Sequence, residues 1–275
     1  MTPVVPVLNN AIVADYLKRF ITEELHSSGF TEASIAVSGG LDSAGVLKLA
    51  CSALEPGHVH PVFLPYKASS EESRRDARAI VSACGLPWTE LDISAMADAY
   101  IALEPGIDRL RIGNLLARLR MAVIFDQSKK ERSLVIGTSN KSELLVGYST
   151  WYGDMACAIM PIGDLYKTQV RSLAVFLGVP QQIVQKPPSA DLWTGQTDEG
   201  EIGVAYDTLD QVLFLLVDQR LSPDEVAQQG FDAGLVQTIE HKIVGSQFKR
   251  VLPPIAKVSQ RTVGTDFLYP RDWHA

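Results

Sequence analysis

The chain of 275 residues is 46% hydrophobic and 21% charged, a composition typical of a globular protein with a sizeable core. Its formal net charge of −7 excludes binding to nucleic acid through an overall positive field, so we expect no nucleic-acid partner. Three scattered cysteines predict neither a disulfide framework nor a metal-binding pair, and VLFLLV, the longest apolar run, is too short for a bilayer. The N-terminus lacks the basic residues of a signal peptide, so we expect a cytoplasmic protein with no membrane partner.

The hydrophobic pattern predicts strands that alternate with helices. In chain order, helices are expected at residues 7–28, 43–54, 69–84, 109–130, 167–177, 199–217, 222–229 and 232–247. Strands are expected at 33–37, 59–65, 88–93, 133–139 and 157–162. Strands that alternate with helices predict an α/β fold, a doubly wound parallel sheet of about five strands with helices on both faces.

We expect residues 1–275 to form one domain, with two irregular segments. Residues 185–201 are polar and rich in turn formers, which indicates a mobile loop. The C-terminal tail, 249–275, carries aromatic and basic residues, so we expect it to dock on the body of the domain.

The sequence SGGLDS stands between the first predicted strand and the next helix, where a parallel sheet binds its ligands. Gly39 and Gly40 permit a ligand to approach the backbone closely, and the helix N-terminus with the hydroxyls of Ser38 and Ser43 favours a phosphate. The carboxylate of Asp42 would repel phosphate unless Mg²⁺ lies between them. The alternative to a phosphate site is a structural turn in which Asp42 caps the following helix. The two glycines alone favour this alternative. The complete pattern favours the phosphate site.

SGGLDS resembles the pyrophosphate loop of adenylating ATPases, which cleave ATP between its α and β phosphates. That group includes NAD, GMP and asparagine synthetases and tRNA-modifying enzymes. Four later motifs are similar to those of NAD synthetases: VIGTSNKSELLVGYSTWYGD (135–154), PIGDLYKTQVRSLA (161–174), PPSADL (187–192) and DEGEIGVAYDTLD (198–210). The resemblance covers nearly the whole chain and implies a fold like that of the adenine-nucleotide alpha-hydrolases.

The resemblance to ammonia-dependent NAD synthetases implies a two-step reaction. ATP adenylates the nicotinate carboxylate of deamido-NAD, pyrophosphate leaves, and ammonia then displaces AMP to give NAD. ATP is the co-substrate and Mg²⁺ the cofactor, and helix 109–130 would be the interface of a homodimer. The chain offers no room for a glutaminase domain before residue 33 or after residue 250. We therefore expect free ammonia, or a separate ammonia donor, to supply the nitrogen.

Three charged residues are the expected catalytic group. Glu143 follows the strand 133–139, so its carboxylate would reach the same sheet edge as Asp42 and complete the Mg²⁺ site. A solvated glutamate in the first turn of a helix is the alternative. Lys167 opens a helix, where the helix dipole disfavours a cation. The resemblance assigns Lys167 and Ser189 to the ATP phosphates, and an ordinary surface lysine is the alternative.

For the deamido-NAD site we expect six residues: Asn114, Arg118, Thr138, Trp151, Asp154 and Lys249. The resemblance implies Asn114, Arg118, Asp154 and Lys249, whereas Thr138 is expected from its hydroxyl, which could donate to a phosphate or to the dinucleotide, and Trp151 from its aromatic ring. Two positions depart from the family pattern. Trp151 stands where a lysine is usual, and Ala158 where many members have an aspartate. Losing both charges together preserves the charge balance of a partly buried site. We expect Trp151 to stack on the nicotinate ring.

Two other functions stay open at this point. Another adenylating enzyme could amidate or thiolate a different nucleotide or a tRNA, but a thiolating enzyme would need paired reactive cysteines and a tRNA enzyme a basic appendage. A noncatalytic nucleotide-binding module would not need both Asp42 and Glu143.

Overall fold

A parallel β-sheet lies at the centre of the computed structural model, which describes residues 5–189, 191, 193 and 195–266. Within the described residues the sheet has four strands, in the order β3 (Thr89–Glu90), β2 (Val59–Phe63), β1 (Ala33–Ala36) and β4 (Leu134–Val135). Ala33 pairs with Val59 on one side and with Leu134 on the other. The chain therefore builds outward from β1 through β2 to β3, then returns to the opposite side of β1. The topological switch point, where such sheets bind ligands, lies between β1 and β4.

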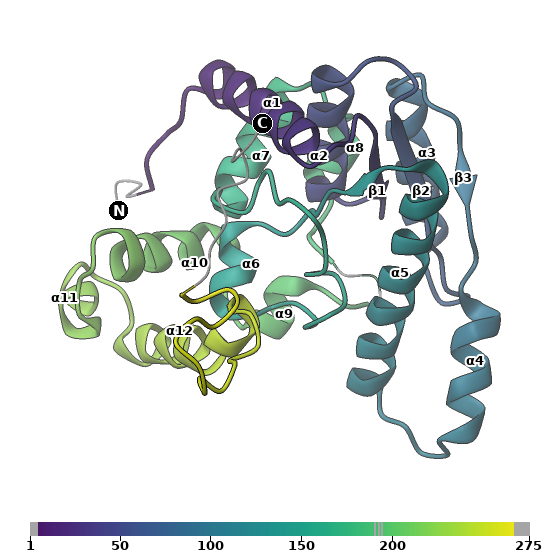
Figure 1. Ribbon diagram of the computed structural model, residues 1–275. Helices are drawn as coiled ribbons and strands as arrows, with labels where there is room; N and C mark the ends of the chain where they lie inside the picture. The colour runs from purple at the N-terminus through teal and green to yellow at the C-terminus, as the bar shows by residue number, and fades with distance from the viewer. Residues whose placement is uncertain (1–4, 190, 192, 194, 267–275) are drawn as a thin grey trace.

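Helices cover both faces of the sheet (Figure 1). One face carries α1 (Asn10–Ser27), α2 (Leu41–Ala53), α3 (Glu71–Ala83), α7 (Lys167–Phe176) and α8 (Gln181–Gln185). The other face carries α4 (Ser94–Leu103) and α5 (Arg109–Glu131). Alternate residues of β1 serve the two faces: Ile35 packs with the first set of helices, and Ala36 packs with the second.

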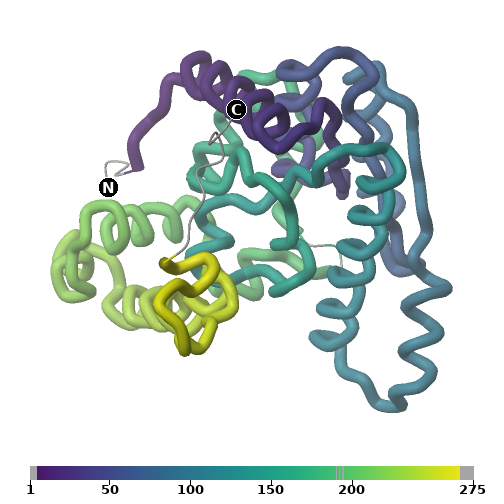
Figure 2. Tube along the Cα trace, in the orientation of Figure 1, coloured from purple at the N-terminus to yellow at the C-terminus, as the bar shows by residue number. Residues whose placement is uncertain are grey.

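A second helical unit packs beside the sheet layer, as the chain path in Figure 2 shows. Its helices are α6 (Lys141–Val146), α9 (Asp198–Ile202), α10 (Tyr206–Leu213), α11 (Pro223–Gln228) and α12 (Ala233–Gly245). A π-helical turn, η1 (Phe214–Asp218), extends α10, and a 3₁₀ turn, η2 (Gln247–Arg250), follows α12. Because α6 also follows β4, this unit is joined directly to the switch point.

The doubly wound α/β architecture predicted from the sequence is confirmed, with local differences. Residues 157–162 do not form a strand; only Ile159 bridges to Ile136, because Pro161 has no N–H to continue the ladder. The predicted helix 199–217 is divided, because Gly203 takes a left-handed φ of 92° and ends α9. Helices α4, α6 and α8 were not predicted.

The two irregular segments stay predictions. The segment 185–201 includes the first four residues of α9, and its residues 190, 192 and 194 lie outside the described part of the chain. In the C-terminal tail, residues 251–261 are exposed and Thr262 is buried, while 267–275 lie outside the described residues. Over the ranges that the structure describes, no helix is long and apolar enough to cross a membrane.

Candidate active site

The phosphate loop follows β1 and turns directly into α2. Gly39 has a φ of 81°, and a Cβ atom placed on it would lie 2.3 Å from the carbonyl oxygen of Ser73 on α3. Only glycine fits this close packing of loop on helix. Gly40 begins α2 without a side-chain cap, so the N-terminus of that helix is left for a ligand. The hydroxyls of Ser38 and Ser43 lie 3.1 Å apart beside it.

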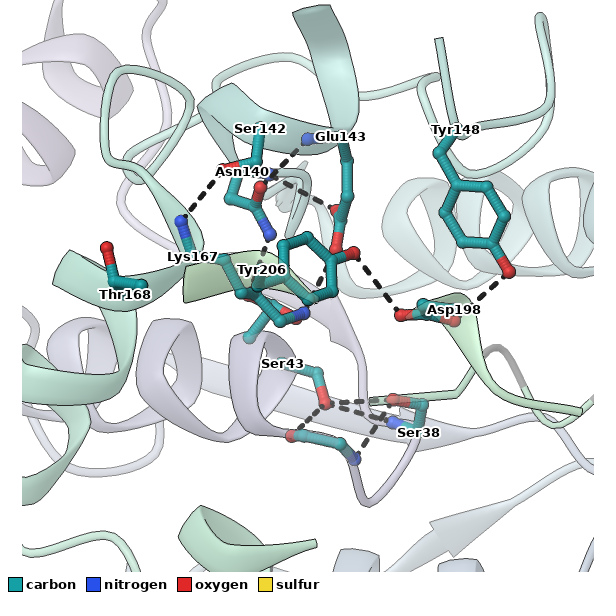
Figure 3. Close-up of polar contacts among 12 residues, drawn as sticks. Ser38, Ser43, Asn140, Ser142, Glu143, Tyr148, Lys167, Thr168, Asp198 and Tyr206 are labelled. Atoms are coloured by element: carbon teal, nitrogen blue, oxygen red, sulfur yellow. Dashed lines mark hydrogen bonds and ion pairs between the residues drawn. The ribbon is translucent and has the colours of Figure 1, made fainter. Parts of the chain in front are cut away.

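The charged side chains of Asp42, Glu143 and Lys167 meet at the switch point. Figure 3 labels Glu143 and Lys167. The ammonium of Lys167 donates to Asp42 Oδ2 at 2.5 Å and to Glu143 Oε1 at 3.0 Å. The Lys167 side chain is 3% exposed, and those of Asp42 and Glu143 are 16% and 15% exposed. The structure therefore brings together the three residues that the sequence predicted to be catalytic, although Lys167 lies 125 positions from Asp42 and 24 positions from Glu143 in the chain.

Local sequence fixes the two carboxylates. Asp42 lies in the first turn of α2, where the helix dipole stabilises a negative charge. Glu143 is held by a capping box: its N–H donates to Asn140 Oδ1 at 3.0 Å, and its Oε2 accepts from the Asn140 N–H at 3.4 Å. The Asn140 amide also donates to Asp42 Oδ1 at 3.1 Å. Sequence analysis missed Asn140, although Asn-x-x-Glu at a helix start is a readable signal.

For both Glu143 and Lys167, burial and the neighbouring charges act on the pKa in opposite directions. Burial raises the pKa of Glu143 to about 7, against the attraction of the Lys167 ammonium. Burial by itself would lower the pKa of Lys167, but the carboxylates of Asp42 and Glu143 outweigh it and hold that pKa above its ordinary value. Lys167 is therefore a permanent cation, while Glu143 carries a charge that its surroundings do not fully stabilise.

The donor set fits Mg²⁺ only in part. Asp42 and Glu143 offer the hard carboxylate oxygens that Mg²⁺ prefers, and their contact with one shared ammonium places them close together. The described residues contain no group of three or more His, Cys, Asp or Glu side chains suited to a metal ion. Two carboxylates are sufficient for Mg²⁺ when substrate phosphates and water complete its shell.

The predicted acceptor residues gather around a second loop, 147–154. Arg118 on α5 donates through Nε and Nη2 to the carbonyl oxygen of Trp151, each at 3.3 Å. Asn114, one helical turn earlier, accepts from the hydroxyl of Thr150 at 2.9 Å. Asp154 accepts from the Thr150 N–H at 2.6 Å and so closes the loop. The structure thus joins Asn114, Arg118, Trp151 and Asp154.

Lys249 and three aromatic rings complete this loop. The Trp151 ring stacks on Tyr152 with centroids 4.5 Å apart, and its edge meets Phe248 at 5.4 Å. The Lys249 ammonium donates to the carbonyl oxygens of Gly147 and Ser149, both at 2.7 Å. Trp151 therefore belongs to an aromatic cluster, which the sequence did not predict because Phe248 is almost a hundred positions away.

Thr138 and Ser189 are the two remaining predicted site residues. Thr138 is half-buried between β4 and Asn140, on the switch-point side of the sheet. Ser189 is exposed, and its hydroxyl accepts from the Asp191 N–H at 3.1 Å. The Asp191 carboxylate in turn accepts from the Ser70 N–H at 3.0 Å, at the start of α3. The role predicted for Ser189 thus stays a prediction, and its neighbours 190 and 192 lie outside the described residues.

The parallel sheet, its switch point and the open phosphate loop define an α/β nucleotide-binding protein with the adenine-nucleotide alpha-hydrolase fold. Proteins with this fold catalyse many different reactions, so the fold alone does not define the reaction of this chain. The NAD synthase family model matches residues 13–253. The chain belongs to the NAD synthase family.

Relatives and solved structures agree with this assignment. An NH₃-dependent NAD⁺ synthetase of Trichlorobacter lovleyi is 47% identical over 97% of each chain, and one of Chlorobium phaeobacteroides is 45% identical over 97% of this chain and 96% of that protein. The structure of the NH₃-dependent NAD synthetase of Campylobacter jejuni superposes with a TM-score of 0.78 at 30% identity, over 91% of this chain and all of that one. An NMN synthetase from Francisella tularensis has a TM-score of 0.81 at 28% identity, over 90% and 99% of the two chains.

Proposed function

We propose that this chain is an NH₃-dependent NAD synthetase, which amidates deamido-NAD with ammonia at the expense of ATP. The observation that carries the proposal is the Asp42–Lys167–Glu143 cluster at the switch point, directly beside the open N-terminus of α2. Relatives about 45% identical over nearly the whole chain have this activity by name.

In the first step, an oxygen of the nicotinate carboxylate attacks the α-phosphorus of ATP, the α–β bridging bond breaks, and pyrophosphate leaves. The phosphate loop holds the departing phosphates through the N–H groups at the start of α2 and the hydroxyls of Ser38 and Ser43. The Lys167 ammonium neutralises the charge that develops on them. Bound Mg²⁺, held by Asp42 and Glu143, would add positive charge at the same phosphates.

In the second step, the nitrogen of ammonia attacks the acyl carbon of the adenylate, AMP leaves, and the nitrogen loses a proton to give the amide of NAD. We assign deamido-NAD to the loop 147–154 and its neighbours on α5. Arg118 supplies a cation for the dinucleotide phosphates, and Trp151 supplies a ring face for the nicotinate.

The quaternary structure and the ammonia source are part of the proposal. Exposed apolar side chains lie on the two helices that cover the sheet face opposite α1: Leu110 and Phe125 on α5, and Met96 and Tyr100 on α4. We propose that this face joins two copies of the chain into a homodimer. Ammonia comes from solution or from a separate donor protein.

The decisive assay uses purified protein with ATP, Mg²⁺, ammonium and one acceptor at a time. With deamido-NAD we expect NAD, AMP and pyrophosphate in equal amounts. Formation of ADP would refute the adenylating mechanism. Nicotinate mononucleotide serves as the competing acceptor, because an NMN synthetase has a similar fold. Faster turnover with the mononucleotide would replace the proposed acceptor and leave the adenylation chemistry intact.

Two variants test the assigned cluster. Asp42→Asn and Glu143→Gln each remove one negative charge at nearly constant volume, so both should abolish pyrophosphate release and still unfold in one cooperative thermal transition. Asp224→Asn is the matched control, because Asp224 is an exposed aspartate in the first turn of α11. Full activity of either cluster variant would show that the carboxylates are structural.

A further inference from the structure

The motif DEGEIGVAYDTLD supplies no residue that the proposed reaction assigns to ATP or deamido-NAD. The structure places two of its residues, Tyr206 and Asp210, against Lys167 (Figure 3 shows Tyr206). They lie four residues apart on α10, so both project from one face of that helix. Both side chains are fully buried. A fully buried carboxylate is costly unless it is hydrogen-bonded, so the partners of Asp210 indicate its purpose.

Asp210 fixes the backbone of Lys167. Its Oδ2 accepts from the Thr168 N–H at 2.8 Å, and its Oδ1 accepts from the Ser142 hydroxyl at 2.5 Å. The Ser142 oxygen in turn accepts from the Lys167 N–H at 2.9 Å. The Asp210 carboxylate therefore holds two N–H groups in the first turn of α7: that of Thr168 by a direct hydrogen bond, and that of Lys167 through the Ser142 hydroxyl.

This arrangement also explains how a cation is tolerated at the start of a helix. The N-terminus of α7 disfavours the Lys167 ammonium, whereas the carboxylate of Asp210 at the same end is favoured. Because Ser142 immediately precedes Glu143, the same network fixes α6 relative to α7. The distance from the Lys167 ammonium to the Glu143 carboxylate, 3.0 Å, thus depends on Asp210.

Tyr206 limits the direction of the Lys167 side chain. The centre of its ring lies 5.1 Å from the ammonium, within the range of a cation–π contact. Its hydroxyl is 3.5 Å from Asp198 Oδ2, and Asp198 Oδ1 accepts from the Tyr148 hydroxyl at 3.1 Å. The ring therefore has its own support from α9 and lies beside the ammonium.

We propose that Asp210 and Tyr206 are positioning residues that aim the Lys167 ammonium at the ATP phosphates. The inference rests on the proposed role of Lys167. Asp210 sets where α7 begins, and Tyr206 sets where the side chain points. Neither residue touches substrate, and both act through Lys167.

The experiment measures ATP·Mg²⁺ affinity and steady-state kinetics for Asp210→Asn and Tyr206→Leu. Asp210→Asn turns one acceptor into a donor, and loss of one hydrogen bond to a charged group should weaken ATP affinity by roughly 10-fold or more. The KM for deamido-NAD should stay within about twofold, because the loop 147–154 is untouched. Asp207→Asn is the matched control: Asp207 is exposed on the same helix, so both KM values should be unchanged.

A double-mutant cycle with Lys167→Met separates positioning from general support of the fold. If Asp210 and Tyr206 act through Lys167, their substitutions should have no further effect on ATP affinity once the ammonium is gone. Lys167→Gln, which also lacks the charge, replaces Lys167→Met if the latter lacks a cooperative thermal transition. Undiminished effects in the Lys167 variant, or equal rises in both KM values, would overturn the inference. Wild-type turnover by Lys167→Met would instead refute the role proposed for Lys167 itself.

Discussion

Substitution of Gly39 by alanine tests the phosphate loop most directly. Two separate costs are expected. The φ of 81° places an alanine in the left-handed region, which costs about 1–2 kcal/mol. The new Cβ would also lie 2.3 Å from the Ser73 carbonyl oxygen, so loop and α3 must separate by about 1 Å to reach ordinary contact. Overpacking of this kind costs a further ~1–3 kcal/mol.

Two other glycines separate these costs. Gly29 has a φ of 77° and nothing within 4 Å of its Cβ position, so Gly29→Ala should show the backbone cost alone. Gly40 has a φ of −91°, and its nearest neighbour is the rotatable hydroxyl of Ser38 at 3.2 Å. Gly40→Ala should therefore change the free energy of unfolding by less than about 1 kcal/mol.

The assay combines urea unfolding with the rate of pyrophosphate release. Gly39→Ala should lose about 2–5 kcal/mol of unfolding free energy. It should also lose about 100-fold in kcat/KM for ATP, because a 1 Å displacement of a binding loop has effects of that size. Gly29→Ala should keep full activity. If Gly39→Ala matched Gly29→Ala in both measurements, the close contact with Ser73 would be irrelevant to the site.

Three further outcomes are expected. Burial raises the pKa of Glu143 in the folded state from 4.5 to about 7, so ionisation of Glu143 destabilises the parent protein as the pH rises. In Mg²⁺-free buffer, the unfolding free energy of Glu143→Gln should therefore exceed that of the parent by an amount that grows by about 3 kcal/mol from about pH 4 to pH 8. A difference that does not change with pH would contradict this prediction. Trp151→Ala should raise the KM for deamido-NAD about 10-fold, the effect expected for loss of one stacking partner, and should leave the KM for ATP unchanged. An unchanged KM for deamido-NAD would exclude stacking of Trp151 on the nicotinate ring. Leu110→Asp, at a side chain 69% exposed on α5, should give a monomer by analytical ultracentrifugation; an intact dimer would place the interface elsewhere.

The sequence by itself determined the parts of this protein whose cause is local. Alternating strand and helix patterns predicted the parallel sheet, and SGGLDS after an apolar strand predicted the phosphate loop, because a glycine turn before a helix start needs no distant partner. Asp42, Glu143 and Lys167 were each found from a helix-start position together with a family motif. Element boundaries were less accurate where a single residue decides them, as at Pro161 and Gly203.

Only the tertiary structure decided which residues support that site. Asn140 reaches Asp42 because β1 and β4 are neighbours in the sheet, and Asp210 reaches the start of α7 because α6, α7 and α10 pack together. These contacts join residues 42 to 98 positions apart, and no local pattern specifies such pairs. The physical reason is that a buried hydrogen bond depends on the packing of whole helices and strands, whereas a phosphate loop depends on a few consecutive backbone angles.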